Sequence, residues 1–187
     1  MVFGNNVTLI GSRKAPQEVL EIQTQIGNRL SLLGIKGFSG GAPGSDYAFM
    51  KDYDKDLRCV IIPTNGFNGH YRDIGIHVFT DLDIEIRNKA EKLARHFYKD
   101  YDIRNEMVQY LQCRNMMQVL GLSLNKKVDS VIFWGPENSK GVIKGGTRTA
   151  VYLARYLGIK TYNLYFQETM GFVKAELGLT TSLDSFF

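Results

Sequence analysis

Residues 7–13, VTLIGSR, carry the strongest indication of architecture in this chain, because a short apolar run rich in β-branched residues ends there in a glycine. Such a run predicts a buried β-strand. A helix is predicted from Pro16, since proline suits the first helical turn. The apolar positions from Val19 to Leu33 recur at helical spacing, and Gly34 ends the helix.

Short apolar runs alternate with longer amphipathic stretches through the rest of the chain. Strands are predicted over residues 36–39, 59–62, 131–134 and 161–164, and helices from Ser45, over residues 82–98 and 104–122, and after Gly146. This alternation predicts an α/β fold with a mainly parallel sheet of about five or more strands and helices on both faces. Residues 64–80 show no clear period and are expected to form a loop. The pattern weakens from Gln167, where a packed or frayed tail is expected.

Length and composition predict one domain that spans residues 1–187, with the part from about residue 167 weakly assigned. Hydrophobic residues make up 44% and charged residues 22%, which excludes a disordered or collagen-like chain. No apolar run suits a membrane-spanning helix, and the first residues do not resemble a secretory signal, so a cytoplasmic protein is expected. Cys59 and Cys113 are expected to be buried free thiols, and no metal site is predicted.

The formal charge of +4 mildly favours an anionic partner. The basic residues are scattered, and the longest basic run is Lys126-Lys127. A nucleic-acid partner is therefore possible from the sequence but is not favoured.

Three predicted strand-to-helix loops are rich in glycine and would emerge at the carboxyl edge of the sheet, where ligands bind. They contain Gly11, Ser12 and Arg13; Ser39, Gly40, Gly41, Gly44, Ser45 and Asp46; and Gly145, Gly146 and Thr147. Glycine permits close backbone approach, and the helix that follows offers unpaired N–H groups, so such loops bind phosphate. Alternatively, the glycines form tight turns, and Ser12, Ser45 and Thr147 cap helices.

Neither a Walker loop nor a GxGxxG dinucleotide motif is present, so the three turns indicate a nucleotide or phosphoribosyl group that lies across the sheet edge. Arg13 would supply a charged contact. Asp46 would accept hydrogen bonds from ribose hydroxyls, or would only complement the helix dipole. Phe67 and Asn68 are candidates for contacts with a base, although packing of Phe67 on the domain surface is the alternative.

These turns resemble those of the SLOG superfamily of Rossmann-like proteins, which includes DNA-processing protein A (DprA/Smf) and the Lonely Guy proteins. The nearest resemblance is to a phage-associated, DprA-like nucleotide-binding branch. It also rests on Pro63 with residues 66–69, on Arg114-Asn115 with residues 118–121, and on Gly158-Ile159 with residues 162–164. It extends over about residues 7–165 and implies a Rossmann-like, doubly wound sheet whose turns bind a nucleotide-derived ligand.

In the Lonely Guy proteins, an arginine and a glutamate after the glycine-threonine turn cleave a nucleotide at its N-glycosidic bond. Arg114 matches the arginine, and Asn115 beside it is a candidate ligand contact, but Thr147 is followed by Arg148, Thr149 and Ala150. Asp46, Asp73 or Glu137 are the possible substitutes for that glutamate. The resemblance therefore favours nucleotide binding with no required cofactor. An N-glycosidic hydrolase or transferase and a single-stranded DNA binder remain the alternatives. It also implies a homo-oligomer in a bacterial or phage-infected cytosol.

Overall fold

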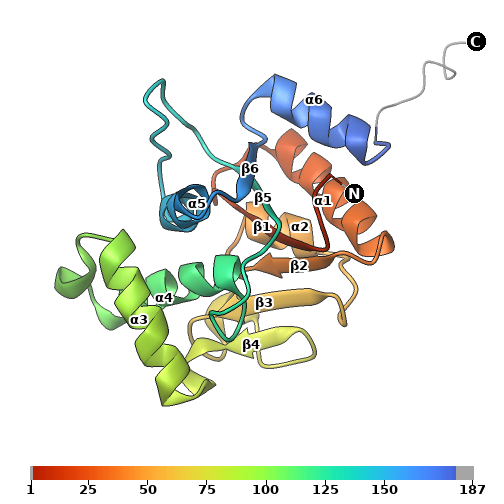
Figure 1. Cartoon of the computed structure of the whole chain (residues 1–187). Helices are drawn as coiled ribbons and strands as arrows, with labels where there is room; N and C mark the ends of the chain where they lie inside the picture. The colour runs from red at the N-terminus through yellow and green to blue at the C-terminus, as the bar shows by residue number, and fades with distance from the viewer. Residues whose placement is uncertain (1, 180–187) are drawn as a thin grey trace, which may run out of the picture.

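The structure, a computed structural model, describes residues 2–179. Its centre is β1 (Asn6–Gly11), which pairs in parallel with β2 (Lys36–Ser39) on one side and β5 (Ser130–Trp134) on the other. Adding β3 (Arg58–Ile62), β4 (Ile76–Val78) and β6 (Lys160–Asn163) gives a six-stranded sheet of order β4-β3-β2-β1-β5-β6. All of its pairings are parallel, and Figure 1 shows the sheet among its helices. The predicted Rossmann-like α/β architecture is confirmed.

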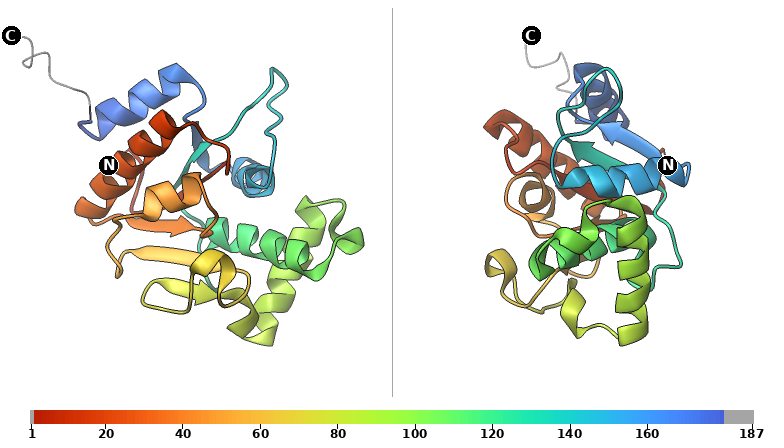
Figure 2. Two further views of the ribbon diagram at one scale, coloured as in Figure 1. Left: turned by 180° about the vertical axis from the view of Figure 1, so that it is seen from behind. Right: turned by 90° about the vertical axis from the view of Figure 1, so that its left-hand side faces the viewer.

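Helices cover both faces of this sheet (Figure 2). One face packs against α1 (Gln17–Leu32), α2 (Ser45–Met50) and α6 (Gln167–Glu176). The other packs against α3 (Ile84–Phe97), α4 (Glu106–Leu120) and α5 (Thr147–Tyr156). No helix within residues 2–179 is long and apolar enough to cross a membrane.

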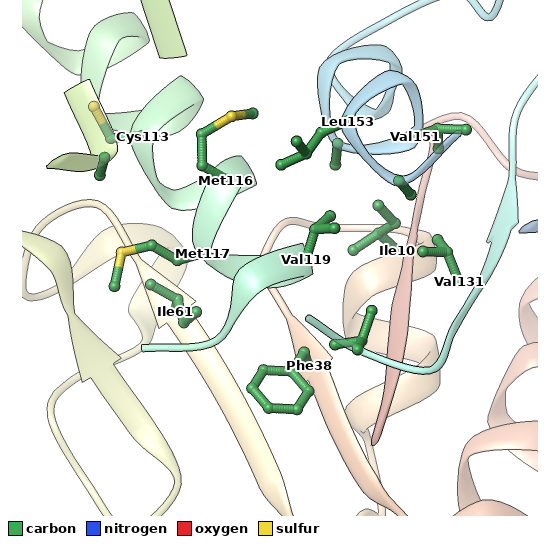
Figure 3. Close-up of a cluster of buried hydrophobic side chains, with 14 of the residues drawn as sticks. Ile10, Phe38, Ile61, Cys113, Met116, Met117, Val119, Val131, Val151 and Leu153 are labelled. Carbon is green, nitrogen blue, oxygen red and sulfur yellow. The ribbon is translucent and has the colours of Figure 1, made fainter. Parts of the chain in front are cut away.

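The methionines of α4 belong to the core, as their helical spacing predicts. Met116 and Met117 are fully buried, and Met117 lies beside Ile61 of β3 (Figure 3). Cys59 and Cys113 are buried free thiols, and burial raises their pKa values to about 12 and about 11. Both thiols therefore act as small apolar groups in this interior.

Two parts of the chain differ from the sequence prediction. The expected loop over residues 64–80 contains the edge strand β4, whose three residues are too few to show a period. The expected tail contains α6, which packs on β6 through the buried side chains of Met170 and Val173. Its hydrophobic pattern is weak because only two of its ten residues are buried.

Candidate functional site

The candidate site lies where β1 and β5 adjoin, although three other strands separate them in the sequence. The connection after β1 leads to α1 on one face of the sheet, and the connection after β5 leads to α5 on the other. Chains that diverge in this way open a crevice at the carboxyl ends of the strands, where ligands of α/β proteins bind. A cleft of about 570 Å³ occupies this position. It is lined by residues 10–14, Ala42, Asp46, Leu111, Gln112, Arg114, Asn115, Gln118, Trp134, Pro136 and residues 144–147.

The first and third glycine turns meet in this cleft. Gly11, Ser12 and Arg13 line it from β1, while Gly145, Gly146 and Thr147 line it at the start of α5. Gly145 has a φ of +96°, a conformation that favours glycine. A Cβ atom added at Gly145 or at Gly146 would meet no atom within 4 Å. The backbone of the third turn therefore faces open space beside the N-terminus of a ten-residue helix.

The second turn differs from the expectation that all three turns aim their N–H groups into one cavity. The carboxylate of Asp46 accepts hydrogen bonds from the backbone N–H groups of Gly11 (3.0 Å) and Gly40 (3.2 Å). Of this turn only Ala42 and Asp46 line the cleft, so the structure places Ser39, Gly40, Gly41, Gly44 and Ser45 outside its lining. Asp46 thus occupies the position that a bound anion would otherwise take.

The side chain of Ser45 hydrogen-bonds the backbone of the first turn and does not cap a helix. The Oγ of Ser45 donates to the carbonyl oxygen of Ser12 at 3.1 Å and accepts from Nε2 of Gln23 at 3.1 Å. Gly44 and Gly146 occupy the N-cap positions of α2 and α5. Pro16 occupies the N-cap position of α1, so the alternative of helix capping by Ser12, Ser45 and Thr147 is wrong. The buried Ser45 instead joins the first turn to the second.

Asp46 and Arg114 form a buried ion pair in the cleft wall. Oδ2 of Asp46 lies 3.4 Å from Nη1 of Arg114, and their side chains are only 5% and 8% exposed. Burial raises the pKa of Asp46, and the Arg114 guanidinium and the N–H groups of Gly11 and Ala42 oppose this. Because the polar neighbours of the carboxyl are donors, the ionised form is the one that satisfies them. Nε of Arg114 has no hydrogen-bond partner among the described residues.

Amide side chains of α4 connect this ion pair to the third turn. The Gln118 oxygen accepts from Gly40 N (2.9 Å) and from Nη1 of Arg114 (3.0 Å), and its nitrogen donates to Oδ1 of Asn115 (3.2 Å). Nδ2 of Asn115 donates to the carbonyl oxygen of Gly146 and to Oε1 of Gln112, both at 3.2 Å. Asn115 therefore positions the Gly145-Gly146 turn.

The charge of the cleft is positive. Its lining holds Arg13, Lys14, Lys144 and Arg114 against one carboxylate, Asp46, which is already paired with Arg114. Arg13, Lys14 and Lys144 are exposed at the rim. Such a cleft attracts an anionic ligand.

Sequence reasoning missed several lining residues: Lys14, Lys144, Gln112, Gln118 and Trp134. The two lysines directly adjoin predicted turns, so their position in the sequence could have indicated that they line the site. Gln112 and Gln118 lie three residues from Asn115 on either side, which places all three on one face of a helix. Only the packing of α4 shows that this face turns toward the cleft.

Phe67 and Asn68 lie outside the cleft lining. Phe67 packs against the core on the α1 face, and Nδ2 of Asn68 donates to the carbonyl oxygen of Gly41 at 3.2 Å. The possible substitutes for the missing glutamate also lie elsewhere: Glu137 binds Arg155, and Asp73 pairs with Lys55 and Arg58. Residues 2–179 contain no group of three acidic, histidine or cysteine side chains that would hold a metal ion.

Comparison with known proteins adds evidence on the fold. No family model matches the sequence. No curated protein matches it either. Among solved structures, DNA processing protein A from Helicobacter pylori, described for its single-stranded DNA binding mode, is similar with a TM-score of 0.51 and 16% identity. The match covers 84% of this chain and 64% of that chain. The likeness is one of fold, and it agrees with the Rossmann-like architecture predicted from the sequence.

Proposed function

We propose that the protein binds a nucleotide or a nucleotide-derived ligand in the cleft between β1 and β5. The observation that carries the proposal is the convergence of two glycine turns with three rim cations at the point where the strand order reverses. The open backbone at Gly145 and Gly146 and the first N–H groups of α5 suit a phosphate group. Arg13, Lys14 and Lys144 would supply its charge-assisted contacts.

A thermal shift assay with a panel of nucleotides tests this proposal. Ligand at about 100 times its dissociation constant stabilises a protein by about 2.7 kcal/mol, so a bound nucleotide raises Tm. Gly146→Val should remove the shift, because the new side chain fills open space in front of the third turn. Gly171→Val is the matched control, since this glycine of α6 also faces open space and lies outside the cleft. A shift that survives Gly146→Val would contradict the proposal.

The proposal concerns binding, because Asp46 is the one carboxylate in the described lining and three donors engage it. Cleavage of an N-glycosidic bond needs an acid or a base near the leaving group. Release of free base from nucleoside monophosphates, lost in Arg114→Ala, would extend the proposed function to catalysis.

Single-stranded DNA is a second candidate ligand, favoured by the single-stranded DNA binding described for the similar protein from Helicobacter pylori and by the exposed cations at the rim. A strand would place one nucleotide in the cleft and its neighbours across Arg13, Lys14 and Lys144. If excess mononucleotide displaces a bound oligonucleotide, the two ligands share a site. Tight binding of the oligonucleotide with no competition would separate the two candidates.

A further inference from the structure

The amide groups of α4 have orientations that their neighbours determine. At one end, Gly40 N and Nη1 of Arg114 only donate, so the group of Gln118 that faces them is its oxygen. At the other end, the carbonyl oxygen of Gly146 only accepts, so Asn115 turns its nitrogen toward it. The two ends agree, because the Gln118 nitrogen then meets the Asn115 oxygen at 3.2 Å. No free choice of orientation remains for Asn115 or Gln118.

This order extends to Gln112. Nδ2 of Asn115 donates to Oε1 of Gln112, so Nε2 is the part of the Gln112 amide left for other contacts. Gln112 lines the cleft and is 7% exposed, and no acceptor within residues 2–179 bonds its Nε2. This nitrogen is not among the fully buried polar atoms of the described residues that lack a partner, so it is accessible to a ligand. The protein therefore offers a fixed hydrogen-bond donor, and no acceptor, to whatever enters the cleft.

The surroundings of Gln112 suit a neutral ligand atom better than a phosphate. A phosphate finds charged donors at Arg13, Lys14 and Lys144, and open backbone at the third turn. Gln112 is neutral, more than nine-tenths buried, and next to Leu111, which also lines the cleft. A carbonyl oxygen on a nucleobase fits such a donor, whereas an exocyclic amino group would present a second donor to it.

We infer that Gln112 donates a hydrogen bond from Nε2 to a keto oxygen of the base, and that the cleft therefore selects keto-bearing nucleotides over amino-bearing ones. This inference rests on the proposed nucleotide binding and names the determinant of base preference. Two pairs of ligands exchange a keto for an amino group at one ring position: inosine and adenosine monophosphate at C6, and uridine and cytidine monophosphate at C4, where both pyrimidines keep the keto oxygen at C2. We expect the keto member of at least one pair to bind about tenfold more tightly, because it gains a hydrogen bond that the amino member cannot form.

Calorimetric titration of the four nucleotides with three variants tests the inference. Gln112→Glu keeps an oxygen toward Asn115 and replaces the donor by an acceptor, so the preference should reverse toward the amino member. Gln112→Met removes the donor without adding charge, and the ratio should fall to about one. Gln167→Glu, at an exposed position in the first turn of α6 and outside the cleft lining, adds the same charge and should keep the wild-type ratio.

Ribose 5-phosphate, which has a phosphate and no base, separates the two ends of the ligand. Its affinity should be the same for the wild type and Gln112→Met. If Gln112→Met instead lost as much affinity for ribose 5-phosphate as for the keto nucleotides, Gln112 would contact the phosphate and the inference would be overturned. The inference would also be overturned if the wild type bound both members of each pair with equal affinity, or if both Gln112 variants kept the wild-type ratio. Either result would leave the proposed nucleotide binding intact. If the wild type binds none of the four nucleotides, the proposed function fails, and the base preference with it.

Discussion

Gly40 shows how a single residue joins the second turn to the cleft wall. A Cβ atom added there would lie 1.1 Å from Nη1 of Arg114 and 2.4 Å from the side-chain amide of Gln118. Its φ is not positive, so the requirement for glycine is one of space. The glycine-rich turn that resembles a phosphate loop is therefore needed here for close packing on a buried guanidinium.

Gly40→Ala should accordingly lower the free energy of unfolding by about 1–3 kcal/mol, the usual cost of overpacking a well-packed interior. Urea denaturation measures it. Gly171→Ala is the control: its new methyl group meets nothing in the helix α6, and replacing a helical glycine should stabilise by about 0.5–1 kcal/mol. Equal stability of Gly40→Ala and the wild type would contradict the packing of Arg114 against this turn.

Asp46→Asn tests the buried ion pair. It leaves Arg114 charged without its partner and turns amide hydrogens toward donors, so we expect a loss of about 3–5 kcal/mol. Replacing Arg114 as well, by methionine, should cost less than the two single changes combined, because the orphaned charge is then gone. Urea denaturation of the four proteins measures this coupling. Strict additivity would show that the pair does not act as a unit.

At the scale of elements, residues 135–146 form an arm that leads from β5 to the third turn, visible beside α5 in Figure 1. Two groups fix its base. Arg155 of α5 donates to both carboxylate oxygens of Glu137, at 2.8 and 3.1 Å. Nδ2 of Asn163, the last residue of β6, donates to Glu137 at 2.9 Å and to the Gly135 carbonyl oxygen at 3.0 Å. Since Lys144 and Gly145 lie at the end of this arm, these contacts position part of the cleft.

The arm should make stability depend on pH. Burial raises the pKa of Glu137, but the hydrogen bonds from Arg155 and Asn163 outweigh it and hold the pKa below the usual 4.5. A lowered pKa means that the stabilisation is complete above the pKa of the unfolded chain and is lost as pH falls through the folded value. Glu137→Gln should therefore cost about 1–3 kcal/mol at pH 7 and progressively less below about pH 4.5.

Urea denaturation of Glu137→Gln and wild type between pH 7 and pH 3 provides the measurement. Glu168→Gln, at an exposed position in α6, is the control for removing a carboxylate that makes no such contacts. A difference in the free energy of unfolding between Glu137→Gln and wild type that stays constant with pH would contradict an ionised Glu137 paired with Arg155.

The same elements show what sequence could predict. Strands β1, β3 and β5 follow from runs of apolar residues, because a parallel strand covered on both faces needs such a run. Strands β2 and β6 contain fewer apolar residues and follow from their place in the alternation of strands and helices. The three-residue strand β4 and the sparsely buried α6 carry too little pattern. All three glycine turns were predicted to share a site, since the carboxyl ends of parallel strands meet at one edge of the sheet, and the structure brings the first and third turns together. Two features could not be predicted, because they depend on contacts between distant segments. The carboxylate of Asp46 binds the N–H groups of the second turn, and Gln112 faces the cleft.

For the whole molecule, the charge distribution limits how DNA would bind. The net charge of +4 is spread over the surface, and the cleft rim holds three exposed cations, Arg13, Lys14 and Lys144. The affinity for a single strand falls with salt with a logarithmic slope of about −0.7 for each phosphate that is neutralised. If a strand crosses only this rim, three phosphates are neutralised, and the slope should be about −2.

Fluorescence anisotropy of a labelled oligonucleotide over a range of salt concentrations measures this slope. Lys14→Gln and Lys144→Gln should each reduce its magnitude by about 0.7, because each removes one phosphate contact. Lys89→Gln is the matched control, since this exposed lysine of α3 lies outside the cleft lining. A slope much steeper than −2 that neither rim variant changes would place the strand on another surface. In that case the cleft would remain a site for single nucleotides, and the two candidate functions would belong to different faces of the molecule.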